Sequence, residues 1–255
     1  MSAPVFLADA GKLDGHGPGS RYVLEGTEAR HAGVVQRRRA GERIDVADGA
    51  GVRLECVIAS VDPGRLVLDV VGRRDDPSPA VRLVLAQALA KGDRDEMAIE
   101  AATEVGVDEV VPWQAERSVV VWRGERAAKS RARWLVTVRE ATKQARRARL
   151  PQVAHAVDTT GLAERVRTVV SDGGAALVLD GAGTVPLASA PLPDGATPAD
   201  VLVVVGPEGG IADAELKALA DAGALVARLG PTVLRTSTAG PVALALLAQR
   251  LGRWA

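Results

Sequence analysis

Residues 201–210 read Val201-Leu202-Val203-Val204-Val205-Gly206-Pro207-Glu208-Gly209-Gly210, an apolar strand that runs directly into a glycine-rich loop. Asp213 follows and is predicted to cap the next helix. Ligands of open α/β sheets bind beyond the carboxyl ends of strands, where such loops lie. Glycine lets the backbone approach a ligand closely. The stretch therefore predicts an α/β domain with a binding loop here, although glycine turns also serve as plain connectors.

A second strand ends in a comparable loop, Leu229-Gly230-Pro231-Thr232-Val233-Leu234-Arg235-Thr236-Ser237-Thr238-Ala239. An apolar helix is predicted from 239 to 251, with Ser237 or Thr238 as its N-cap. Arg235 is a lone charge between an apolar strand and an apolar helix. It is either a solvated arginine or one that contacts nucleic acid or a partner chain.

The pattern of the chain changes once, near a charged and proline-rich stretch at 73–79 that reads as a linker. Before it, alternating apolar residues and tight turns predict short strands and a small barrel. One helix is expected from Thr27 to Arg38. After the linker, apolar strands alternate with helices, which is typical of a parallel sheet. We therefore predict two domains, residues 1–73 and 80–255.

Basic side chains gather at two places, although the 32 basic and 32 acidic residues cancel overall. The first cluster is at 37–39. The second follows a long helix predicted over 126–146, on which residues three and four apart share a face. Such a face can lie along a phosphate backbone, or it is a solvated helix end that favours the helix dipole. The residues predicted to contact RNA are Arg37, Arg38, Arg39, Arg139, Lys143, Arg146, Arg147 and Arg149.

Several other classes of protein are disfavoured. The single cysteine, Cys56, excludes an internal disulfide and is predicted to pack in the core, as are the four tryptophans. The three histidines are scattered without the spacing of metal ligands, so we predict no metal site. We see no apolar run that would span a membrane and no secretion signal, which favours a cytoplasmic protein.

Five segments in this order resemble the RsmE family of ribosomal RNA uridine-N3 methyltransferases, within the SPOUT superfamily. Both glycine loops match the family closely. Two further matches are Glu104-Val105-Gly106-Val107 with Glu116-Arg117-Ser118, and Gln144 to Pro151. The fifth is His31 to Arg39, followed by Gly41-Glu42 and Asp48-Gly49. The resemblance covers nearly the whole chain, but Ser237 stands where the family often has Glu.

The resemblance implies an N-terminal PUA-like β-barrel and a C-terminal SPOUT α/β domain with a deep trefoil knot. It also implies a homodimer that acts on 16S ribosomal RNA or on the assembled 30S subunit. S-adenosyl-L-methionine would bind in the knot loops. Carried over from the family, the cofactor-binding residues are Leu179, Asp180, Gly181, Gly206, Pro207, Glu208, Gly209, Gly210, Leu229, Gly230, Val233, Leu234, Arg235, Thr236, Thr238 and Ala239.

The implied chemistry assigns two catalytic candidates. Uracil N3 carries a proton in neutral RNA, and Arg235 could stabilise the charge that forms on the base oxygens when it leaves. Glu208 is the nearest acidic residue by motif and is a hypothesis for the proton acceptor. Two alternatives stay open: a ribosome-associated RNA-binding protein without catalysis, and a SPOUT methyltransferase that acts on another base or on a ribose 2′-oxygen.

Overall fold

The computed structural model describes residues 3–254, which form two compact units. One unit comprises the chain up to Ser78 together with Thr142–Leu150. The other comprises Pro79–Ala141 and the chain from Pro151 onward. The segment Thr142–Leu150 therefore belongs to the first unit, although it lies far along the sequence. A hydrogen bond of 2.9 Å from Leu150 N–H to the carbonyl of Gly49 holds this segment in place.

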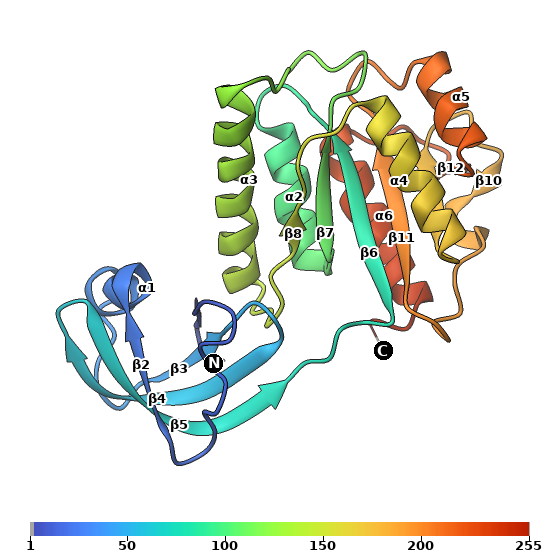
Figure 1. Ribbon diagram of the computed structural model, residues 1–255. Coiled ribbons are helices and arrows are strands. Elements are labelled where there is room, and N and C mark those ends of the chain that lie inside the picture. The colour runs from blue at the N-terminus through green and yellow to red at the C-terminus, as the bar shows by residue number, and fades with distance from the viewer. Residues whose placement is uncertain (1–2, 255) are drawn as a thin grey trace. The chain divides into compact units, whose positions relative to one another are not determined.

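The first unit is a curved five-stranded sheet in the order β1-β3-β4-β5-β2 (Figure 1). Its strands are β1 (Val5–Leu7), β2 (Arg21–Glu25), β3 (Arg43–Ala47), β4 (Val52–Asp62) and β5 (Arg65–Asp75). Only β1 and β3 are parallel. Register shifts near Cys56 and Ser60 interrupt the β4–β5 ladder, and such bulges bend a sheet. Because β5 continues to Asp75, the linker begins later than the sequence predicts.

Alternating residues of these strands bury one face, around Leu54, Ile58 and Leu68. Cys56 lies in this core, where burial raises the pKa of its thiol to about 12. The prediction that this cysteine packs in the core is therefore confirmed.

The helix predicted from Thr27 to Arg38 is wrong in its extent. The structure has α1 (Gly26–Arg30) and then one π-helical turn, η1 (His31–Val35). The backbone of Arg37 takes a left-handed φ of 53°, and Arg38 N–H donates to the carbonyl of Ala32 at 3.0 Å. This reversal ends the helix.

The second unit is a seven-stranded sheet in the order β10-β12-β9-β11-β6-β7-β8, with parallel pairing throughout. This arrangement confirms the predicted α/β class. The strands are β6 (Val81–Ala88), β7 (Glu109–Trp113), β8 (Gln152–Val153), β9 (Ala175–Leu179), β10 (Val185–Pro186), β11 (Ala199–Val205) and β12 (Leu225–Arg228). A short 3₁₀ turn, η2 (Leu187–Ser189), follows β10.

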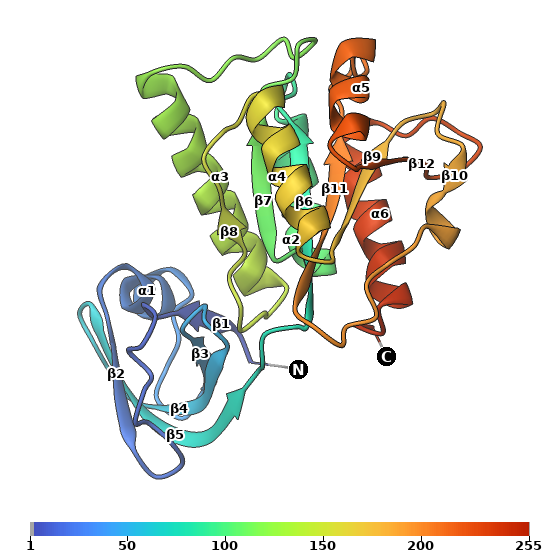
Figure 2. The same cartoon turned by 45° about the vertical axis from the view of Figure 1, so that its right-hand side comes forward.

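Helices cover both faces of this sheet (Figures 1 and 2). On one face lie α4 (Thr159–Ser171) and α5 (Asp213–Asp221), which pack on each other over Val84, Val178 and Val204. On the other face α2 (Arg94–Val105) packs on α6 (Thr236–Arg250). The central strands β6, β7, β9 and β11 are buried on both faces, which explains why their sequences are mostly apolar runs rather than alternating ones.

Two helix boundaries differ from the predictions. Asp213 is the first residue of α5; the N-cap is Ala212, whose N–H donates to Glu215 at 3.3 Å. Ser237 and Thr238 lie inside the first turn of α6, because the helix begins at Thr236 and Arg235 is its N-cap. Asp93 is the N-cap residue of α2; its backbone is left-handed and its side chain makes no capping hydrogen bond. The helix ends at Gly106, which is its C-cap and is also left-handed.

The long helix α3 spans Glu125–Gln144, so it ends before Arg146. Arg146 has a left-handed φ of 55°, which starts a turn. Trp113, Trp122 and Trp134 are buried as predicted, whereas Trp254 is about half exposed. Among the described residues, no helix has the length and hydropathy needed to span a bilayer, and no cluster of His, Cys, Asp and Glu is suited to a metal ion.

Candidate functional site

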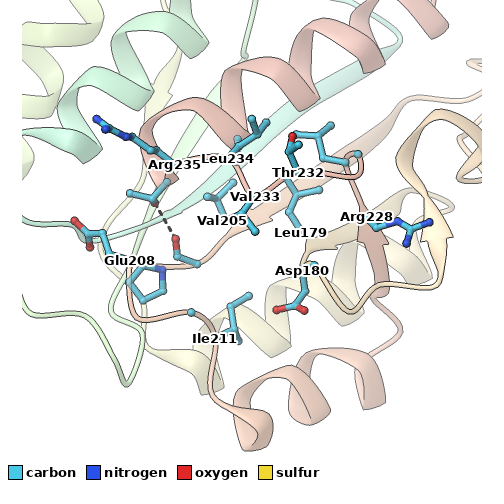
Figure 3. Close-up of a pocket in the computed structure, with 18 of the residues that line it drawn as sticks. Leu179, Asp180, Val205, Glu208, Ile211, Arg228, Thr232, Val233, Leu234 and Arg235 are labelled. Carbon is cyan, nitrogen blue, oxygen red and sulfur yellow. Dashed lines mark hydrogen bonds between the residues drawn. The ribbon is translucent and has the colours of Figure 1, made fainter.

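The loops that follow β9, β11 and β12 surround a cavity of about 620 Å³ (Figure 3). These three strands are parallel neighbours in the sheet, so their carboxyl ends lie at the same edge. The two glycine loops quoted from the sequence therefore come together, as predicted. The predicted cofactor residues that line the cavity are Leu179, Asp180, Gly181, Gly206, Pro207, Glu208, Gly210, Leu229, Gly230, Val233, Leu234, Arg235, Thr236 and Ala239.

Two predicted cofactor residues do not line the cavity. The carbonyl of Gly209 accepts a hydrogen bond from Arg117 Nη1 at 3.1 Å, and a Cβ at this glycine would lie 3.2 Å from the Cβ of Arg117. Gly209 thus packs against a neighbouring loop. Thr238 is exposed in the first turn of α6. Six residues that were not among the predicted cofactor residues also line the cavity. Val205, Pro231 and Thr232 belong to the two quoted stretches, whereas Arg94, Ile211 and Arg228 were not indicated by the sequence.

At its glycine positions, the wall of the cavity consists of backbone alone. A Cβ built on Gly181 or Gly230 would meet no other atom within 4 Å. Gly206 differs, because a Cβ there would lie 2.5 Å from Ile211 Cγ1. A side chain at Gly181 or Gly230 would project into open space, whereas one at Gly206 would disturb the loop itself.

Glu208 is held by groups at the start of α2. Its Oε1 accepts from Arg94 Nη1 at 2.8 Å and from Lys91 N–H at 3.3 Å. Partial burial raises the pKa of Glu208, but hydrogen bonds from its own backbone N–H, from Arg94 and from Lys91 outweigh burial, so the pKa lies below its ordinary value. The carboxylate is therefore ionised near neutral pH and is a weak proton acceptor.

The backbone and the side chain of Arg235 have different roles. Its carbonyl accepts from Thr238 N–H at 2.8 Å and Ala239 N–H at 2.9 Å, which caps α6. Its guanidinium makes no hydrogen bond or ion pair with any residue that the structure describes. Figure 3 shows Arg235 on the same side of the cavity as Glu208. An unpaired arginine at the mouth of a cavity is available to a ligand.

One polar residue near this site was missed from the sequence. Gln87 lies in β6, is fully buried, and its Nε2 donates to Thr236 Oγ1 at 2.9 Å. Thr236 Oγ1 in turn donates to the carbonyl of Gly206 at 2.8 Å. An amide in a strand that is apolar apart from Arg82 near its start was the available signal.

The basic residues predicted to contact RNA do not share one helical face, because α3 ends at Gln144 and Arg146 and Arg147 follow it. Lys143 pairs with Glu28 at 3.4 Å, with both side chains mostly buried. Arg149 donates to the carbonyls of Asp76 and Pro77, each at 3.1 Å from Nε. These two cations therefore support the first unit itself.

The other predicted RNA contacts are placed as follows. Arg37 and Arg39 are exposed, whereas Arg38 pairs with Glu42 at 3.1 Å. Arg146 is exposed, and its carbonyl accepts from the Arg53 guanidinium. Arg139 lies on α3 in the second unit and is partly buried.

Comparison with known proteins defines the class of this fold and site. A family model described as an RNA methyltransferase domain matches residues 76–248, which include every strand of the parallel sheet and all three cavity loops. The chain is thus an RNA methyltransferase.

Whole-chain relatives narrow the class to one family. The ribosomal RNA small subunit methyltransferase E of Mycobacterium tuberculosis is 44% identical over 239 residues, which cover 92% of this chain and 89% of that protein. The Bacillus subtilis protein of the same name is 30% identical over 230 residues, 89% of each chain. The chain belongs to the ribosomal RNA small subunit methyltransferase E family, as the five segments predict.

A solved structure agrees over the whole chain. The ribosomal RNA small subunit methyltransferase E of Neisseria gonorrhoeae, bound to S-adenosyl methionine, superposes with a TM-score of 0.83. It is 26% identical, and the alignment covers 98% of both chains.

Proposed function

We propose that this enzyme transfers the methyl group of S-adenosylmethionine to N3 of a uracil in 16S ribosomal RNA. Methylation of small-subunit RNA follows from its family, and its solved Neisseria relative binds the same methyl donor. The observation that carries the proposal is the cavity at the carboxyl edge of the sheet, formed by the two loops with the strongest resemblance to uridine-N3 methyltransferases.

The residues present fit S-adenosylmethionine. The cavity volume of about 620 Å³ lies within the range of roughly 300–1,000 Å³ that is usual for small-molecule sites. Bare backbone at Gly181 and Gly230 leaves room for a flat ring and offers N–H and C=O groups to an adenine. When bound, the cofactor supplies an electrophilic methyl group on a sulfonium. The loops would align that group with the attacking base, and alignment alone can remove a large part of the barrier.

Two side chains at the mouth are candidates for acting on the RNA base. Arg235 has no partner among the described residues, so its guanidinium can stabilise negative charge on the uracil oxygens as the N3 proton leaves. The role of Glu208 as proton acceptor stays a prediction. Its lowered pKa and its bond to Arg94 favour a different role, in which the ionised carboxylate holds Arg94 at the cavity mouth. Uracil N3 is used in base pairing, so the target base must be unpaired or flipped out.

The first unit is proposed to be a PUA-like barrel that binds the RNA, and 1–73 and 80–255 are proposed as the two domains. Its curved, bulged sheet supports this assignment. Exposed Arg37, Arg39 and Arg146 are the best placed of the predicted contacts. We further propose that the C-terminal loops form a trefoil knot, that the enzyme is a homodimer, and that it works in the cytoplasm on the 30S subunit or its RNA.

The test uses purified full-length protein and small subunits from a strain that lacks this methyltransferase. We expect calorimetry to detect S-adenosylmethionine binding and mass spectrometry to detect 3-methyluridine in the treated RNA. Binding of RNA without binding of the cofactor would instead indicate a ribosome-associated protein without catalysis. A methylated ribose or another methylated base would contradict the assignment to uracil N3.

A further inference from the structure

The amide of Gln87 joins two walls of the cavity without lining it. A hydroxyl has one hydrogen, and Thr236 donates it to the Gly206 carbonyl, which can only accept. Thr236 Oγ1 must therefore accept from Gln87, which fixes the amide with Nε2 towards the threonine at 2.9 Å. The three residues come from β6, from the loop after β11 and from the start of α6.

The fold alone does not favour glutamine at this position. Gln87 Oε1 is buried and has no hydrogen-bond partner in the described part of the chain. A buried acceptor without a donor destabilises the folded state, and an apolar side chain of similar size would avoid this. The bare Gly240 of α6 makes room for Leu85 rather than for the amide, since a Cβ there would lie 3.0 Å from Leu85 Cδ1 but 3.6 Å from Gln87 Oε1, an ordinary contact. What Gln87 contributes is therefore its amide N–H group, which donates to Thr236.

We infer that Gln87 is a positioning residue for the methyl donor. Through Thr236 it sets the spacing between the Gly206 loop and the first turn of α6, and so it holds the cavity in the shape that the cofactor occupies. This inference rests on the proposed function, because it assigns that cavity to S-adenosylmethionine.

The test compares Gln87→Leu and Thr236→Val with the unchanged full-length enzyme. We expect each variant to weaken S-adenosylmethionine binding by about tenfold, since one well-placed buried hydrogen bond has roughly that effect. KM for the cofactor should rise while kcat changes little. The unfolding midpoint without ligand should stay the same or rise for Gln87→Leu, because its orphan acceptor is gone. A merely structural role would lower the midpoint and leave the dissociation constant unchanged.

Thr236→Ser keeps the hydroxyl and should retain tight binding. Thr103→Val is the matched control: Thr103 is also fully buried and donates to a backbone carbonyl, that of Ile99 at 2.7 Å, but within α2 away from the cavity. It should leave cofactor binding unchanged. Because Gln87 and Thr236 act through one chain of bonds, the double variant Gln87→Leu/Thr236→Val should bind no more weakly than either single variant.

The possible results distinguish a failure of the proposed function from a failure of the positioning role of Gln87. If the unchanged enzyme does not bind S-adenosylmethionine, the proposed function is wrong. If it binds and Gln87→Leu binds equally well, the positioning role is overturned. If Gln87→Leu does not fold, the Thr236→Val and Thr236→Ser pair decides, and equal binding by both variants would overturn the inference.

Discussion

The amino and carboxyl edges of the parallel sheet use charged residues in opposite ways. At the amino edge, Glu109 accepts from Arg82 at 2.9 Å and from Arg165 at 2.6 Å. Asp108 accepts from Arg253 at 2.6 Å and from Leu83 N–H at 2.8 Å. At the carboxyl edge, the guanidinium of Arg235 has no such partner among the described residues. The charges at the amino edge hold the fold. The carboxyl edge combines one fixed pair, Glu208 with Arg94, with the unpaired guanidinium of Arg235, which is available to a ligand.

A cavity by itself does not distinguish the two edges. A second cavity, of about 490 Å³, opens at the amino edge beside Val81, and Arg250 and Arg253 line it. Arg250 donates to the carbonyls of Leu187 at 2.9 Å and Ala190 at 2.7 Å. Arg253 is bound to Asp108. Both cations of this cavity are already paired or hydrogen-bonded within the fold. The two cavities therefore differ in whether their arginines have free donors, and this difference favours the carboxyl edge as the proposed ligand site.

The largest effect is expected from removing the central carboxylate of the amino edge. Glu109→Ala leaves two arginines without their buried partner, and breaking such a pair costs about 3–5 kcal/mol. Because Arg82 and Arg165 are partly exposed, we expect the free energy of unfolding to fall by about 3 kcal/mol, at the lower end of that range, in urea titrations. The exposed pair of Lys217 and Asp221 is the control, and Lys217→Ala should cost less than about 1 kcal/mol. If Glu109→Ala folds but loses affinity for the cofactor, the amino edge also contributes to binding, and the contrast between the two edges is wrong.

The next largest effect concerns the unpaired arginine of the carboxyl edge. Arg235→Gln should lower kcat by about 10²–10³-fold, the usual effect of removing one group that stabilises developing charge. Stability should not change, because the cap of α6 uses the backbone of Arg235. Single-turnover methylation measures the rate, and Arg126→Gln on the exposed face of α3 serves as the control. A kcat near that of the control would remove Arg235 from the chemistry.

A filled cavity should have a smaller effect, on binding alone. Gly230→Leu places a side chain where a Cβ meets no atom, so the fold should tolerate it. The bound cofactor would then be overpacked, which costs about 1–3 kcal/mol, or roughly thirtyfold in affinity at the middle of that range. Calorimetry tests this against Gly17→Leu, a glycine with equally open surroundings in the first unit. Unchanged affinity in Gly230→Leu would place the cofactor elsewhere.

The smallest effect is the pH dependence of Glu208. Its folded pKa is lowered, so the stability that it contributes is present above the unfolded pKa and is lost as pH falls through the folded pKa. Glu208→Gln should lack this part of the acid transition, by less than about 1 kcal/mol because Arg94 is half exposed. A loss of kcat by about 10²-fold or more, together with loss of the acidic limb of the rate profile, would instead make Glu208 the proton acceptor.

Local patterns predicted the parts of the site that depend on neighbouring residues. The apolar strand before Gly206 and the Gly230 loop lie where the sequence places them, and Gly106 ends α2 with the left-handed backbone that glycine allows. The extents of α1 and α3 were overestimated, since the left-handed turns at Arg37 and Arg146 are conformations that arginine rarely takes.

By itself the sequence determined the α/β class, the family and the two loops that carry the site. The class and the loops depend on strand periodicity and on backbone preferences, which act over a few residues, whereas the family rests on the resemblance of five segments. Only the tertiary structure decided that Glu208 pairs with Arg94, that Gln87 supports the cavity, and that Lys143 and Arg149 are bound within their own unit. Such partners lie far apart in the chain, and they meet through strand order and packing, which no local pattern of residues encodes.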